Sequence, residues 1–244
     1  MRLTEFSALS FDCYGTLIDW ETGLLAAFEP WRKRTGISVT NDELLAHFGA
    51  AESRVEAGNS ALLYPEILAL TLREIGNLFS APASDAEAKN FGNSIKNWPA
   101  FADSPAALAY LKGFYRLVVV SNVDNASFKF SNAKLDVEFD FVVTAEDVGS
   151  YKPAPAHFNR ALELLAGVGV EKSRVLHVAQ SLHHDHVPAK ALGLKTVWVN
   201  RRAAQGGEGG AVKPPEKPVT PDLEVTSLAA LVGLHRAEVA ASKE

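Results

Sequence analysis

An aspartate directly follows the first apolar segment of the chain. Residues 6–11 are apolar and β-prone, and Asp12 comes next, before Gly15 and Thr16 end the strand pattern. Asp12 should therefore lie at the carboxyl end of a parallel strand, where open α/β sheets bind their ligands. A carboxylate at that place is costly to desolvate unless another group pairs with it. Asp12 is a candidate functional residue, and the alternative is an aspartate that only caps a turn.

Polar residues also follow two later apolar segments. Ser121 and Asn122 come after the second predicted strand, and Lys152 stands before a proline after the third. A lysine ammonium within about 4 Å of Asp12 would interact with it by about 4 kcal/mol at an effective dielectric of 20. Such a contact would keep Asp12 ionised and able to react. The alternatives are an ordinary turn serine and a solvated surface lysine.

The fourth predicted strand is followed by Gln180, His183, His184 and Asp185. The histidines invite comparison with a metal site. Adjacent residues of a helix point about 100° apart, however, and metal-binding histidines on a helix normally use positions i and i+4. The spacing does not favour a metal, and we expect His183 or His184 to donate a proton or to anchor a hydrogen bond.

Short apolar segments alternate with helical ones through most of the chain. This alternation is typical of a parallel, doubly wound α/β sheet, and we predict a Rossmann-like core. The predicted strands are residues 6–11, 115–120, 139–143, 174–178, 195–199 and 223–225.

The region between the first two predicted strands has a helical pattern throughout. Its apolar residues recur at helical spacing, and it contains no convincing strand. We therefore predict an inserted helical cap domain at residues 20–99, and a core domain formed by residues 1–19 and 100–244. Trp20 and Trp98, at the two ends of the cap, could wall an apolar pocket, and simple packing is the alternative.

Composition limits the classes of partner. The 244 residues are 47% hydrophobic and 22% charged, as in globular proteins, and the net charge of −5 with no long basic run argues against nucleic acid. No apolar stretch approaches the ~20 residues that span a bilayer, and the start of the chain leaves no room for a signal peptide. With a single cysteine, we expect a cytoplasmic location. Residues 203–221, rich in glycine and proline, predict a surface loop.

Residues 12–17, Asp-Cys-Tyr-Gly-Thr-Leu, resemble the first motif of the haloacid dehalogenase superfamily, Asp-x-x-Gly-Thr-Leu. Ser121, Lys152 and Asp185 fall where the later motifs of that family occur. The resemblance implies that Asp12 is a covalent nucleophile. It also implies that Ser121, with nearby backbone N–H groups, holds an oxygen of Asp12 or the oxyanion that forms on it, and that Lys152 keeps Asp12 ionised and helps to stabilise that oxyanion. Asp185 is expected to hold Lys152 or to orient the hydrolytic water.

Two departures from the phosphatases of this superfamily are informative. Tyr14 stands where they carry a second aspartate, which protonates the leaving alcohol, and Gln180 replaces the acid that mainly holds Mg²⁺. A neutral amide is a weak partner for a hard dication. An alkoxide leaving group needs a general acid, whereas a halide needs none. The chain thus resembles the 2-haloacid dehalogenase branch, and we expect no metal and no cofactor.

The resemblance implies a small carboxylic acid substrate with a substituent at C2. Asp12 would displace the substituent and form an aspartyl ester, and (S)-2-haloacid dehalogenase activity is the first expectation. Further contacts with the substrate are expected from Tyr14, Thr16, Trp20, Trp98, Asn122, Gln180, His183 and His184.

The dehalogenases of this type carry an arginine early in the second cap helix, and its absence from this sequence leaves other functions open. This sequence has none there, and the nearest is Arg54. Residues 11–23, 96–101, 131–135, 147–153 and 184–186 resemble the L-azetidine-2-carboxylate hydrolases, relatives that open a strained ring. The alternatives are thus ring opening, in which the leaving nitrogen needs a proton, a small-molecule phosphatase, and a binding protein on a degenerate core. Dimers are common in the superfamily, so a homodimer is among the expected states.

Overall fold

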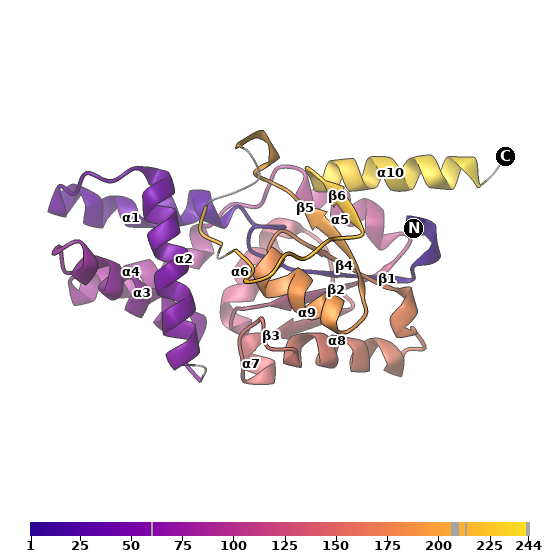
Figure 1. Ribbon diagram of the computed structural model, residues 1–244, viewed down its shortest axis with the longest axis horizontal. Helices are drawn as coiled ribbons and strands as arrows, with labels where there is room; N and C mark the ends of the chain where they lie inside the picture. Colours follow the sequence, from indigo (N-terminus) through magenta and orange to yellow (C-terminus); the bar gives the residue numbers. More distant parts are fainter. Residues whose placement is uncertain (60, 206–209, 213, 243–244) are drawn as a thin grey trace.

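The computed structural model describes residues 1–59, 61–205, 210–212 and 214–242. Its centre is one sheet of six parallel strands in the order β3-β2-β1-β4-β5-β6 (Figure 1), which confirms the predicted fold class. The strands are β1 (Ala8–Phe11), β2 (Arg116–Ser121), β3 (Phe141–Thr144), β4 (Val175–Ala179), β5 (Lys195–Val199) and β6 (Leu223–Val225).

Helices cover both faces of the sheet, so the central strands are buried on both sides and consist almost wholly of apolar residues. In β2, Val118 and Val120 pack on the face covered by α8 and α9, whereas Leu117 and Val119 pack on the opposite face with α5, α6 and α10. The core helices are α5 (Ser104–Lys112), α6 (Asn125–Leu135), α7 (Ala145–Val148), α8 (Ala156–Gly167), α9 (Val187–Ala191) and α10 (Leu228–Ala241).

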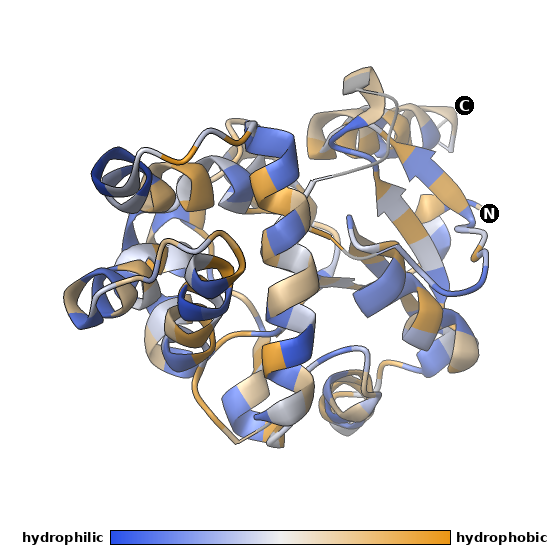
Figure 2. Ribbon diagram, turned by 60° about the vertical axis from the view of Figure 1, so that its left-hand side comes forward, coloured by the Kyte–Doolittle hydropathy of each residue, from blue (hydrophilic) through white to orange (hydrophobic). Residues whose placement is uncertain are grey.

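Four helices leave the core after β1 and form a cap to one side of the sheet (Figure 1). They are α1 (Trp20–Thr35), α2 (Asn41–Gly58), α3 (Tyr64–Leu78) and α4 (Asp85–Gly92). Each carries both hydrophobic and hydrophilic residues (Figure 2), as expected for helices that pack on one side and meet water on the other. No helix in the described parts of the chain is long and apolar enough to cross a membrane.

Short helical turns complete the chain. A π-helical turn, η4, begins just after β4 and is the one that carries the histidines discussed above. The 3-10 turns are η1 (Leu3–Glu5), η2 (Asn93–Asn97), η3 (Lys172–Arg174) and η5 (Ala203–Gln205), and the π turn η4 is Leu182–His186.

The glycine-rich segment before β6 reaches the cap. Ala211 is buried, and its backbone N–H donates to Glu21 Oε1 of α1 at 2.9 Å. A Cβ atom at Gly49 of α2 would lie 2.0 Å from the Ala211 carbonyl oxygen, so only glycine fits there. Around Ala211 this segment therefore packs against the cap, whereas residues 214–221 are exposed or half-buried. Residues 206–209 and 213 lie outside the described residues.

Candidate active site

Asp12 lies at the point where the strand order of the sheet reverses. It follows β1, whose neighbours β2 and β4 lead away in opposite directions, and this is the usual place for a ligand in such sheets. The side chain is buried, and both carboxylate oxygens are held. Thr16 Oγ1 donates to Oδ2 at 2.7 Å, and Lys152 Nζ donates to Oδ1 at 2.9 Å. The carboxylate is thus fixed in direction before any substrate binds.

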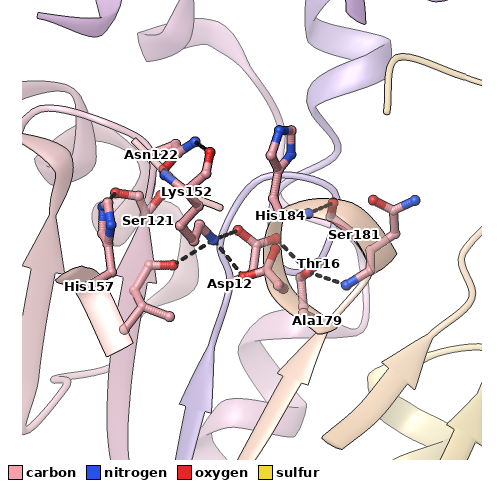
Figure 3. A network of polar contacts seen from close by, with 12 residues as sticks. Asp12, Thr16, Ser121, Asn122, Lys152, His157, Ala179, Ser181 and His184 are labelled. Atoms are coloured by element: carbon pink, nitrogen blue, oxygen red, sulfur yellow. Dashed lines mark hydrogen bonds and ion pairs between the residues drawn. The ribbon is translucent and has the colours of Figure 1, made fainter. Parts of the chain in front are cut away.

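Lys152 is placed by a reciprocal pair of hydrogen bonds. Its backbone N–H donates to Asn122 Oδ1 at 2.6 Å, and Asn122 Nδ2 donates to the Lys152 carbonyl at 3.2 Å. This clamp joins the end of β2 to the loop after β3. The ammonium then reaches Asp12, the Val120 carbonyl at 3.0 Å and Asp185 Oδ1 at 2.7 Å (Figure 3). Lys152 is therefore the cation that two buried carboxylates share.

Asp185 is supported from inside the sheet. His177 Nε2 lies 3.2 Å from its Oδ1, and His177 Nδ1 lies 3.0 Å from Ser10 Oγ. These contacts make a continuous polar chain from β1 and β4 to the nucleophile. Asp185 lines the cavity beside Asp12, and its buried Oδ2 atom has no hydrogen-bond partner among the described residues. It can accept a hydrogen bond from a water molecule or a ligand there.

The charges of this group depend on one another. Burial raises the pKa of Asp12, and the nearby Lys152 ammonium opposes that rise. Burial alone would also raise the pKa of Asp185, but Lys152 and His177 outweigh it and hold that pKa below its ordinary range. Burial alone would lower the pKa of Lys152, yet the two carboxylates raise it above its ordinary value. Lys152 therefore stays protonated across the physiological range.

Ser121 lies at the carboxyl end of β2, as the motif implied, but its hydroxyl is not bonded to Asp12. Its hydroxyl has no hydrogen-bond partner among the described residues, so the expected contact with Asp12 is not made. The Ser121 carbonyl instead lies 3.2 Å from His157 Nε2. Burial, with the Lys152 charge, lowers the pKa of His157 to about 4, so this histidine is neutral at pH 7.

A cavity of about 40 Å³ lies between Asp12 and the cap. A single water molecule needs about 10–15 Å³ of such space, so the cavity can hold only a small ligand in the structure as it stands. A larger cavity of about 550 Å³ contacts neither Asp12 nor Lys152, so we assign the chemistry to the smaller one. Its lining is Asp12, Tyr14, Trp20, Glu52, Glu56, Tyr64, Asn122, Lys152, Ser181, His184, Asp185 and Val212.

Most of the predicted site residues meet at this cavity. Thr16 is not part of the lining, but it contacts Asp12 directly and also accepts the Gln180 backbone N–H at 2.9 Å. Among the described residues, the predicted members that do not line the cavity are Thr16, Trp98, Ser121, Gln180 and His183.

The aromatic residues form a wall under the cap. Tyr14 Oη lies 3.0 Å from Ser131 Oγ, and its ring packs edge-on against Trp98 with 5.4 Å between centroids. Trp98 is fully buried, and its indole N–H donates to Ser94 Oγ at 3.1 Å. Trp98 therefore supports Tyr14 from behind, whereas Tyr14 and Trp20 themselves line the cavity.

Of the polar residues after β4, His184 lines the smaller cavity and Gln180 the larger one. The backbone N–H of His184 donates to Ser181 Oγ at 3.0 Å, and the imidazole of His184 borders the cavity. His183 packs edge-on against His184 with 4.9 Å between ring centroids. Gln180 faces the larger cavity, and its side-chain oxygen has no hydrogen-bond partner among the described residues. Of the three predicted substrate contacts Gln180, His183 and His184, only His184 lines the cavity beside Asp12.

Arg54 does not replace the arginine of the dehalogenases. Its side chain is 61% exposed and forms an ion pair with Glu74 of α3. None of the residues lining the smaller cavity in the described chain is an arginine.

Two glutamates that the sequence analysis did not select face Asp12 from α2. Glu52 and Glu56 are 4% and 7% exposed and line the cavity. Tyr64 Oη of α3 donates to Glu52 Oε1 at 2.5 Å. Burial raises the pKa of Glu52 to about 7, and burial together with Glu52 raises that of Glu56 well above its ordinary value.

Magnesium does not fit the donors around Asp12. The Oδ1 atoms of Asp12 and Asp185 both accept from the Lys152 ammonium, which a dication would have to displace. Gln180 offers only a neutral amide at the place of the phosphatase acid, and it points toward the other cavity. In the described ranges, no three histidine, cysteine or acidic side chains are grouped to hold a metal ion.

Residues 6–193 match the haloacid dehalogenase-like hydrolases, and the chain belongs to this family of enzymes. (S)-2-haloacid dehalogenase of Pseudomonas sp. (strain YL) is 28% identical over 241 residues, 96% of each chain. Haloacid dehalogenase-like hydrolase domain-containing protein 3 of Danio rerio is 34% identical over 112 residues, 45% of each chain, so this chain spans under half of that relative. L-2-haloacid dehalogenase from Xanthobacter autotrophicus, solved with chloropropionic acid covalently bound, superposes on this chain with a TM-score of 0.72 at 19% identity. The match covers 95% of this chain and 98% of that one, so the two share the fold.

The raised pKa of Glu52 predicts a stability effect. A group whose pKa rises from 4.5 to about 7 on folding stabilises the fold below its unfolded pKa, and this contribution is lost as pH rises through 7. Glu52→Gln cannot ionise, so between pH 5 and pH 8 the variant should gain about 3 kcal/mol in unfolding free energy relative to wild type. The titratable and charged groups around Glu52 are Glu56, Tyr64, Asp12, Lys152, His184 and Asp185.

Urea unfolding at pH 5 and pH 8 measures this difference. Glu29→Gln, which changes a 48% exposed glutamate of α1, is the matched control and should show no such dependence. A Glu52→Gln variant whose stability ran parallel to wild type across this range would contradict the buried, proton-binding state of Glu52.

Proposed function

We propose that this chain is a metal-independent hydrolase that displaces the substituent at C2 of a small 2-substituted carboxylic acid. The observation that carries the proposal is the buried Asp12 carboxylate, held by Lys152 and Thr16, with a cavity in front of it and no second acid at Tyr14. A carboxylate fixed in this way can attack carbon. Tyr14 stands where the phosphatases carry the acid that protonates a departing alkoxide, which disfavours phosphate ester hydrolysis.

In the first step, Asp12 attacks C2 and forms an aspartyl ester as the substituent leaves with its bonding electrons. In the second, water attacks the carbonyl carbon of that ester. Lys152 lies 2.9 Å from Asp12 Oδ1 and can stabilise the oxyanion that forms, while Asp185 Oδ2 can orient the water. One displacement at C2 inverts its configuration, because the hydrolysis takes place at the carboxyl of Asp12.

A halide is the first candidate leaving group. The relative from Pseudomonas is named a 2-haloacid dehalogenase and aligns along nearly the whole chain, and the Xanthobacter enzyme holds chloropropionic acid covalently. A ring nitrogen is the second candidate, and the specific observation in its favour is the pair of buried glutamates at the cavity. Both candidates share the attack by Asp12.

Isotope labelling tests that shared step. Under single-turnover conditions in ¹⁸O-water with EDTA, excess enzyme should process L-2-chloropropionate or L-azetidine-2-carboxylate so that ¹⁸O enters Asp12. The hydroxy acid product should carry ¹⁶O, because its new oxygen comes from the Asp12 carboxylate. Peptide mass spectrometry reads both, and the peptide containing Asp185 is the internal control. Label in the product with none in Asp12 would mean direct attack by water and would refute the covalent scheme.

A further inference from the structure

The cap presents two carboxyl groups to the nucleophile. Glu52 and Glu56 stand four residues apart on α2, so their side chains lie on the same face of the helix, one turn apart. Both border the cavity that contains Asp12, and both are more than nine-tenths buried. Like charges at this spacing destabilise a helix, and burial adds the desolvation of each carboxylate. Such an arrangement in a core is unfavourable unless a ligand or a proton compensates it.

Among the described residues that line the cavity, Lys152 is the one permanent cation. Lys152 is already shared by Asp12 and Asp185. Glu52 receives a hydrogen bond from the neutral hydroxyl of Tyr64. The lining thus holds four carboxyl groups against one ammonium group and one imidazole.

A second feature points to a ligand that donates hydrogen bonds. Asp185 is 1% exposed and lines the same cavity, and its buried Oδ2 atom has no hydrogen-bond partner in the described chain. A halide carries no donor and is repelled by carboxylates, and no arginine is present in the lining to offset the repulsion. A protonated nitrogen supplies both positive charge and N–H donors.

We propose that Glu52 and Glu56 bind a protonated nitrogen on C2 of the substrate, so that this chain acts on small cyclic amino acids whose ring nitrogen is the leaving group. This inference rests on the proposed function, because it needs Asp12 to attack C2. It makes the two cap glutamates the residues that determine specificity, in the place where an arginine would select a haloacid.

The protons and electrons of the step balance. As the bond from Asp12 to C2 forms, the C2–N bond breaks and its electron pair stays on nitrogen. The nitrogen carried two protons as a ring ammonium, so it leaves as a neutral primary amine. A proton held by the glutamate pair then converts the amine to an ammonium. Hydrolysis of the aspartyl ester releases one proton, which returns to the pair.

Parallel turnover of two substrates tests the inference. Wild-type enzyme with EDTA should release primary amine from L-azetidine-2-carboxylate with a kcat/KM at least about 100-fold above that for chloride release from L-2-chloropropionate. Glu56→Gln should lower the amine reaction by about 30- to 100-fold, since a hydrogen bond to a charge is lost. The same change should leave chloride release undiminished, because a halide leaves without a proton and makes no hydrogen bond to Glu56. Glu29→Gln is the matched control and should alter neither rate.

Binding to an inactive variant separates recognition from turnover. Calorimetry on Asp12→Asn should detect L-azetidine-2-carboxylate, and adding Glu56→Gln should weaken that binding by about tenfold or more. Near-ultraviolet circular dichroism verifies that each variant is folded. If Glu56→Gln reduces both reactions equally, or if the double variant binds as tightly as the single one, the role of the glutamates is overturned.

The remaining outcomes distinguish the two proposals. Chloride release that equals or exceeds amine release in wild type, with ¹⁸O found in Asp12, would overturn the glutamate inference and leave the proposed function standing. Consumption of neither substrate, with no label in Asp12, would overturn the proposed function and with it the inference.

Discussion

Replacing Lys152 by methionine should lower turnover by about 10³-fold or more and should destabilise the fold by about 3–5 kcal/mol at pH 8. Methionine keeps the length and much of the volume of the side chain but removes its charge. Asp12 and Asp185 would then be two buried carboxylates without the cation that both contact in the native protein. The oxyanion of the ester hydrolysis step would lose its nearest positive charge as well.

The loss of stability should depend on pH in a defined direction. Without the ammonium, burial raises the pKa values of both aspartates above those of the unfolded chain. Stability is then fully retained only below about pH 4 and falls as the pH rises through the folded pKa values. Urea unfolding should therefore show a deficit at pH 8 that shrinks toward pH 4.

Two further variants test this explanation. Lys134→Met removes a lysine whose ammonium donates to the Lys96 carbonyl away from the cavity, and it should change neither stability nor turnover appreciably. Adding Asp185→Asn to Lys152→Met should restore part of the stability, because one uncompensated charge disappears, but no activity. A Lys152→Met enzyme that kept more than a tenth of wild-type turnover would show that the ammonium is not part of the reaction.

The strands of this fold could be predicted because a doubly covered parallel sheet requires continuous apolar runs. Each run in the sequence corresponds to a strand whose ends differ by no more than two residues. Polar residues that interrupt such runs mark the carboxyl ends, and Asp12, Ser121 and Gln180 all lie there. The position of a residue along a strand is thus a local property of the sequence.

The direction of a side chain is not a local property of the sequence. The family motif assigned Ser121 and Lys152 to the oxygens of Asp12 or to the oxyanion formed there; Lys152 does contact Asp12, but Thr16 rather than Ser121 holds the second oxygen. Lys152 approaches from a loop whose course is set by two hydrogen bonds with Asn122. Those contacts join segments about thirty residues apart, so no local pattern could indicate which donor reaches the nucleophile.

The two glutamates of α2 were missed for a different reason. The dehalogenase pattern predicts an arginine in this helix and says nothing about acidic residues there. A local signal was present: Glu52 and Glu56 lie on the apolar face that also carries Phe48 and Val55. Acidic residues are rarely buried unless paired, so two of them within an apolar stripe indicate a functional site. That they face Asp12 depends on how the cap sits on the core, which only the structure gives.

Asp12→Asn should reduce turnover of every substrate by about 10⁴-fold or more, the largest effect expected for this protein. A carboxamide is too weak a nucleophile to displace a substituent from carbon, so no ester can form. The fold should survive, because the amide oxygen can still accept from Lys152, the Thr16 hydroxyl can turn to accept from the amide NH2 group, and Asp185 continues to neutralise the ammonium. Unfolding by urea should therefore leave stability within about 1 kcal/mol of wild type.

Asp12→Glu is the informative companion, because it keeps the charge and moves the carboxylate by one methylene group. A displacement of about 1 Å from the attacking position is expected to reduce turnover by about 10²-fold. The order of activity should thus be wild type, then Asp12→Glu, then Asp12→Asn. In neither variant should ¹⁸O enter residue 12 faster than the variant turns over substrate. Intact-mass spectrometry must verify the Asn variant, since deamidation regenerates the aspartate. An Asn variant of verified mass that kept more than 1% of wild-type turnover would assign the reaction to another nucleophile, and Asp185 or a cap glutamate would then be the next to replace.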